Sequence, residues 1–91
     1  MLSVIPYTDE DEAVRIANDS DFGLGGSVWS ADLQHAAEVA RRVRTGTIGI
    51  NSYVNDPMSP FGGVKASGLG RQMGPEGLAG YEVLKSIYQA P

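Results

Sequence analysis

Short apolar runs recur along this chain and predict strands. Residues 2–7, 26–29 and 47–51 are brief runs that contain β-branched or aromatic side chains, a composition typical of strands. Residues 83–88 alternate loosely between apolar and polar side chains, so we expect a terminal strand there.

Amphipathic stretches separate these runs and predict helices. The acidic run over residues 9–12 suits the first turn of a helix over residues 9–18, with Thr8 as its N-cap, better than a calcium loop, because the EF-hand spacing is missing. A second helix follows a cap at Ser30 or Asp32, and Gly46 is expected just past its end. Its apolar positions recur on one face: Leu33, Ala36, Ala37, Ala40 and Val43. A short third helix is expected to begin at Gly74-Pro75-Glu76.

This alternation of strands and helices predicts an α/β fold built from βαβ units around a parallel sheet. In open sheets of this kind, ligands bind beyond the carboxyl ends of the strands. The chain leaves one such end at Asn51 and runs directly into Tyr53. The irregular stretch over residues 52–74 is long for a compact domain, which indicates either a functional role or packing against another surface.

The glycine-rich segment, residues 60–71, is the most distinctive stretch of the sequence. It holds four glycines in twelve residues, which disfavours a helix and makes a poor strand. One interpretation is a tight surface turn, and the other is a loop that lines a ligand site and presents Phe61. Its place after the sheet makes the second interpretation, for Tyr53 and Phe61, as well supported as the first, and both stay open at this point.

Composition excludes several kinds of chemistry. The 91 residues are 42% hydrophobic and 20% charged, as in globular domains, and the net charge of −4 argues against nucleic-acid binding. No apolar run reaches the ~20 residues of a membrane span, and no secretory signal is visible, so we expect a cytoplasmic protein. Without cysteine there is no thiol nucleophile, and His35 as the only histidine allows no His-pair metal site or catalytic triad.

Several stretches together resemble the C-terminal part of the NAD(P)-dependent aldehyde dehydrogenases. They occur in the order and spacing of that family: residues 22–29, 46–51, 59–71 and 74–78. The resemblance covers the whole chain, which corresponds to about the last fifth of a family member.

The resemblance implies that residues 1–82 belong to the α/β catalytic domain and that residues 83–91 form an oligomerisation strand and tail. Phe61 is implied to lie by the substrate tunnel and the nicotinamide, and Tyr53 at the tunnel mouth. The complete enzyme would oxidise an aldehyde to a carboxylic acid with NAD or NADP. The catalytic Cys, the catalytic Glu and the cofactor domain of the family are not in this sequence, so no cofactor is expected for this chain alone.

Two positions depart from the family pattern. Gln72 replaces the Glu that commonly follows the arginine, which removes an ionisable group from a supposed proton path. Met1 stands where the family carries Val, so we expect a truncated reading frame, a remnant gene or a shortened piece. Two functions therefore compete: a C-terminal enzyme segment that is inactive alone, or a non-enzymatic remnant that forms homo-oligomers or joins full-length subunits.

Overall fold

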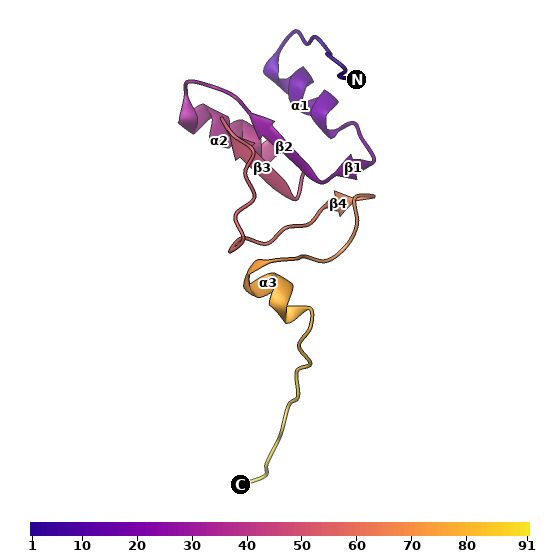
Figure 1. Cartoon of the computed structure of the whole chain (residues 1–91), viewed down its shortest axis with the longest axis vertical. Coiled ribbons are helices and arrows are strands. Elements are labelled where there is room, and N and C mark those ends of the chain that lie inside the picture. Colours follow the sequence, from indigo (N-terminus) through magenta and orange to yellow (C-terminus); the bar gives the residue numbers. More distant parts are fainter.

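The computed structural model describes all residues, 1–91, as three helices and four short strands. In chain order they are α1 (Glu10–Asn18), β1 (Phe22–Gly23), β2 (Gly25–Val28), α2 (Leu33–Arg42), β3 (Thr47–Ile50), β4 (Val64–Lys65) and α3 (Gly74–Ala79). The first two helices and the strands gather at one end of the molecule, and the C-terminal residues run away from them (Figure 1).

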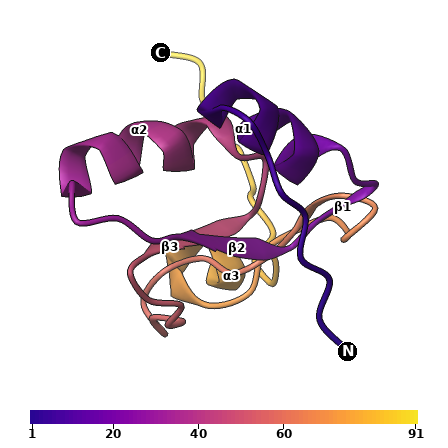
Figure 2. The ribbon, with the colours of Figure 1, turned by 90° about the horizontal axis from the view of Figure 1, so that it is seen from above.

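The central unit consists of β2 and β3, which pair in parallel and are connected by α2. Their register places Gly25 opposite Thr47 and Val28 opposite Ile50. Both α1 and α2 lie on the same side of this strand pair (Figure 2). The buried apolar side chains come from these two helices: Val14 of α1, and Ala36 and Ala40 of α2. Small alanines let the α2 backbone lie close to the strands.

Helix α1 begins one residue later than the sequence suggested. Its N-cap is Asp9, whose carboxylate accepts from the Glu12 backbone N–H at 2.8 Å, and not Thr8. The Thr8 hydroxyl and backbone N–H instead donate to the Glu12 carboxylate at 2.7 and 2.8 Å. These two bonds hold the pKa of Glu12 below its ordinary value.

Helix α2 follows the sequence pattern closely. Asp32 is the cap, and its carboxylate accepts from the His35 backbone N–H at 3.0 Å. The helix ends at Arg42 with Val43 as its C-cap, so the expectation that Gly46 ends it is wrong. Val43 has extended backbone angles, which stop the helix before any left-handed glycine is needed.

Polar contacts connect α1 to α2 at the protein surface. Arg42 pairs with Glu10 at 2.9 Å and with Asp11, and the hydrogen bond to Asp11 raises the pKa of Arg42. The imidazole of His35 contacts the Glu10 carboxylate as well. His35 is therefore an exposed residue of the helix–helix contact, as expected from its place off the apolar face.

The predicted strands over residues 2–7 and 83–88 do not form. Both segments are exposed along their whole length and have no neighbouring strand, and a strand without a partner leaves its ladder of hydrogen bonds unmade. The sheet is accordingly smaller than the predicted set of βαβ units: two pairs, β1–β4 and β2–β3. The oligomerisation strand predicted for residues 83–91 is an extended tail in the single chain (Figure 1).

The chain buries very little of itself. Only six of its residues are buried, and the radius of gyration is 17.8 Å, against about 12 Å for a compact domain of this length. The exposed large apolar side chains include most of the tail, with Val83, Leu84 and Tyr88 each more than 90% accessible. Apolar surface on this scale is typical of a segment that packs against further polypeptide.

Candidate functional site

The glycine-rich segment folds back on itself and on the start of the chain. Its centre forms β4, which pairs antiparallel with β1 through Phe22–Lys65 and Gly23–Val64. Its two ends are joined by a bridge in which the backbones of Phe61 and Gln72 exchange two hydrogen bonds of 2.7 Å. The expectation that this segment is too rich in glycine to form a strand is therefore wrong. Val64 and Lys65, which lie between its glycines, form the short strand β4.

A close backbone contact anchors this segment to β3. A Cβ atom on Gly46, the residue before β3, would collide with the carbonyl oxygen of Gly62. Only glycine allows these two stretches of backbone to approach so closely. The contact holds Phe61 near the start of β3.

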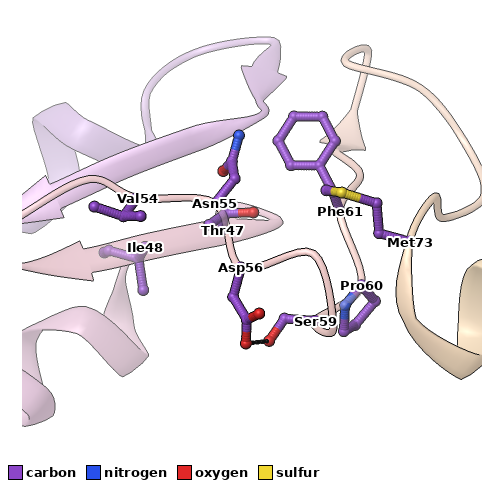
Figure 3. A pocket seen from close by; sticks show the side chains of 9 residues that line it. All are labelled: Thr47, Ile48, Val54, Asn55, Asp56, Ser59, Pro60, Phe61 and Met73. Atoms are coloured by element: carbon purple, nitrogen blue, oxygen red, sulfur yellow. Dashed lines mark hydrogen bonds between the residues drawn. The ribbon is translucent and has the colours of Figure 1, made fainter.

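One hollow next to Phe61 has a volume of about 210 Å³ and is called here the Asp56 pocket (Figure 3). Nine residues line it: Thr47, Ile48, Val54, Asn55, Asp56, Ser59, Pro60, Phe61 and Met73. Asp56 organises its outer wall, since its carboxylate accepts from the Ser59 hydroxyl and from the Met58 backbone N–H, both at 3.0 Å. The hydroxyl of Thr47, one of the lining residues, is buried and has no hydrogen-bond partner within the chain.

A second hollow of about 270 Å³, called here the Arg71 pocket, also adjoins Phe61. It is lined by Leu24, Phe61, Gly62, Gly63, Ser67, Leu69, Gly70, Arg71 and Gln72. Arg71 braces it, because its guanidinium donates to the Gly63 and Gly70 carbonyls at 2.9 and 2.7 Å. Phe61 lines both hollows and is the residue that they share.

Tyr53 lies elsewhere. It lines a shallow hollow of about 390 Å³ with residues 24–27, and its hydroxyl sits where a Cβ atom of Gly25 would be. The structure thus does not bring Tyr53 and Phe61 into one pocket. Leu24 lies between them, since it lines both the Tyr53 hollow and the Arg71 pocket.

Sequence reasoning missed the polar members of the Asp56 pocket. Asp56 and Ser59 have the i, i+3 spacing of a turn in which a side chain caps the backbone, which is a usable signal. Met73 carried no signal, because it reaches the pocket only through the Phe61–Gln72 bridge.

The chemistry of these hollows is that of binding walls. The chain has no thiol, and no group of acidic or histidine side chains is arranged to hold a metal ion. Ser67 is engaged in structure, since its hydroxyl oxygen accepts from the Gly23 N–H at 2.9 Å. None of the three helices has the length and apolar content that a membrane crossing requires.

Family comparison agrees with this combination of a short parallel strand pair and a glycine-rich segment. A statistical description of the aldehyde dehydrogenase family matches residues 1–87. The chain therefore belongs to the aldehyde dehydrogenase family, as its motifs predicted.

Individual members of the family also match this chain in sequence. The chain is 59% identical over 88 residues to geranial dehydrogenase of Castellaniella defragrans and 44% identical over 89 residues to betaine aldehyde dehydrogenase of Brucella ovis. Each match covers 97% of this chain but only 18% of the relative.

Solved structures agree with these sequence relatives. The structure of Mycobacterium tuberculosis aldehyde dehydrogenase complexed with NAD⁺ superposes with a TM-score of 0.83 at 53% identity, covering 85% of this chain and 16% of that one. Apo indole-3-acetaldehyde dehydrogenase gives a TM-score of 0.87 at 41% identity, covering 93% of this chain and 20% of that one. The chain thus spans less than a quarter of the proteins that it matches.

Proposed function

We propose that this chain works as the C-terminal segment of an NAD(P)-dependent aldehyde dehydrogenase. In the complete polypeptide it would supply part of the substrate-tunnel wall and contacts between subunits, and alone it would be inactive. The complete enzyme would oxidise an aldehyde to a carboxylic acid.

The observation that carries this proposal is the amount of apolar surface that the chain leaves uncovered. Its accessible surface is 7540 Å², whereas a compact protein of 9.6 kDa exposes about 5,100 Å². Exposed side chains such as Trp29, Leu33 and Leu78 come from separate elements, so the surface is not one small patch. A segment that normally packs against the rest of an enzyme has this distribution.

The tunnel-wall role rests on Phe61. This half-buried residue lines two hollows whose walls are apolar at several positions, which suits the hydrocarbon part of an aldehyde and favours exclusion of water from it. Tyr53, 48% exposed and outside both hollows, is assigned to the mouth of the tunnel.

The cofactor would be held by other parts of the complete polypeptide. Gly68 and Gly70 follow the two-residue β4 and lead to the Gln72 bridge, not to a helix, so they make no cradle for a diphosphate. Within this chain only the Phe61 ring is proposed to lie near a nicotinamide, and we assign the chain no step of the hydride transfer.

The test is an exchange between relatives. In geranial dehydrogenase of C. defragrans, the stretch that matches this chain would be replaced by the residues of this chain, giving what is called here the exchanged enzyme. We expect it to retain aldehyde-dependent reduction of NAD⁺ or NADP⁺, and the 91 residues alone to have none. Turnover by the 91 residues alone, or a folded exchanged enzyme without activity, would contradict the proposal.

Phe61→Ala in the exchanged enzyme tests the tunnel wall. Removing an apolar ring from a substrate contact costs about 1.5 kcal/mol, so we expect KM for geranial to rise about tenfold. Phe22→Ala is the matched control, because Phe22 is 67% exposed and lines neither the Asp56 pocket nor the Arg71 pocket. An equal effect of both substitutions would argue against a tunnel-wall role for Phe61.

The competing function, a non-enzymatic oligomerisation module, is favoured by the uncovered tail. Residues 83–88 present unpaired backbone and apolar side chains that could pair with another chain. Sedimentation of the purified 91 residues distinguishes the two: defined homo-oligomers would favour the module, and a monomer or heterogeneous aggregates would favour the enzyme segment.

A further inference from the structure

The side chain of Lys65 is half-buried and its ammonium is bound to main chain, although lysine is usually a free surface residue. Its ammonium donates to the carbonyl oxygens of Asn18 and Ser20 at 2.7 and 2.8 Å. Asn18 is the last residue of α1, where carbonyl groups lack helical partners and the helix dipole is negative. A cation with two donated hydrogen bonds is well matched to this position.

The end of α1 is itself fixed to the rest of the fold. The side-chain amide of Asn18 donates to the Arg42 carbonyl at 2.8 Å, and its oxygen accepts from the Arg44 backbone N–H at 2.7 Å. Lys65 therefore reaches a junction at which the C-terminal ends of α1 and α2 meet.

Lys65 also sits at the centre of the segment that forms the Arg71 pocket. Three lining residues directly precede β4, and five follow it: Ser67, Leu69, Gly70, Arg71 and Gln72. Lys65 itself does not line the pocket. The backbone of Lys65 has a left-handed φ of 56°, a conformation that is unusual for lysine and that reverses the chain there. The next residue, Ala66, donates its N–H to the Asp21 carbonyl at 2.8 Å.

We propose that Lys65 is a positioning residue, whose ammonium anchors the glycine-rich segment to the end of α1 and thereby sets the shape of the substrate-binding wall around Phe61. This inference rests on the proposed function, because it assigns the Arg71 pocket to substrate. Lys65 touches neither pocket, so its effect on binding is transmitted through β4 and the backbone on either side of it.

The test uses three variants of the exchanged enzyme. Lys65→Met keeps the length of the side chain and removes both hydrogen bonds, Lys65→Gln can keep one of them, and Lys65→Arg keeps the charge and the donors. We expect KM for geranial to rise at least fivefold in Lys65→Met, with kcat within twofold of the parent. The rise in KM should be smaller in Lys65→Gln. In Lys65→Arg, KM should lie within twofold of the parent. Arg41→Gln, on the exposed end of α2, removes the same charge and should leave KM unchanged.

Hydrogen exchange gives a readout that does not depend on activity. In Lys65→Met, peptides covering residues 61–72 should exchange at least tenfold faster, while peptides from β2 and β3 should be unchanged. The inference would be overturned if hydrogen exchange over residues 61–72 were unchanged in Lys65→Met. It would also be overturned if this variant lost folded yield and kcat while its KM stayed constant. If the parent exchanged enzyme were inactive, the proposed function would be refuted. The hydrogen-exchange rates of the parent and of Lys65→Met would still test whether Lys65 anchors the glycine-rich segment.

Discussion

On its own, this 91-residue chain should not keep the fold described here. The perturbation is to study it without the further polypeptide that the proposed function assigns to it. The excess of accessible surface over that of a compact protein of equal mass is about 2,400 Å². Since about 57% of protein surface is apolar, about 1,400 Å² of this excess is hydrocarbon.

The corresponding free energy is large. At about 25 cal/mol per Å², the uncovered hydrocarbon forgoes about 35 kcal/mol of hydrophobic stabilisation. The net stability of a whole domain is only about 5–15 kcal/mol. Three buried side chains, Val14, Ala36 and Ala40, cannot offset such a deficit.

Urea titration followed by circular dichroism, together with binding of the dye ANS, provides the assay. We expect the isolated chain to show no cooperative transition and to bind ANS strongly, whereas the exchanged enzyme should unfold cooperatively and bind little dye. A monomeric isolated chain that unfolds cooperatively, with a radius of gyration near about 12 Å in scattering, would refute the reasoning.

Further predictions concern single positions in the exchanged enzyme. Gly46→Ala should prevent folding or lower Tm severely, because its Cβ meets backbone; normal Tm and yield would contradict this. Asn51→Ala should destabilise by about 2 kcal/mol in urea titration, since Asn51 has a φ of 55° and exchanges two 2.8 Å hydrogen bonds with Ser30; Asn51→Gly should recover the backbone part. Thr8→Val should lower Tm at neutral pH. Folding lowers the pKa of Glu12, so the contribution of the Glu12 carboxylate to stability is present above pH 4.5 and is lost as pH falls through its pKa in the folded state. The difference in Tm between Thr8→Val and the parent should therefore vanish in acid.

The helices were predictable because their signals are local. Helix α2 has a one-sided apolar pattern and an aspartate at its start, and both act within a few residues of sequence. The same holds for the short α3, where Pro75 marks the first turn. Strands depend on partners far away in the chain, and the patterns over residues 2–7 and 83–88 describe surfaces that pair only when a neighbour is present.

The site was predictable in part. Phe61 stood out because a glycine-rich segment follows it, and the structure places it between two hollows. The anchor formed by Lys65 was invisible in the sequence, because its partners are main-chain oxygens at positions 18 and 20, which no side-chain pattern reports. The separation of Tyr53 from Phe61 depends on how the loop over residues 53–59 turns, which its sequence does not determine.

Under the proposed function, the contrast between that loop and the glycine-rich segment bears on how the substrate range of the complete enzyme could change in evolution or in the laboratory. Every residue from Tyr53 to Ser59 is exposed, and its internal hydrogen bonds are those of the turn organised by Asp56. In the glycine-rich segment, a Cβ atom on Gly62 would collide with the Gly70 carbonyl and one on Gly63 would collide with Ser67. Libraries intended to admit new aldehydes to the complete enzyme should therefore randomise residues 53–59 and leave Gly62 and Gly63 unchanged.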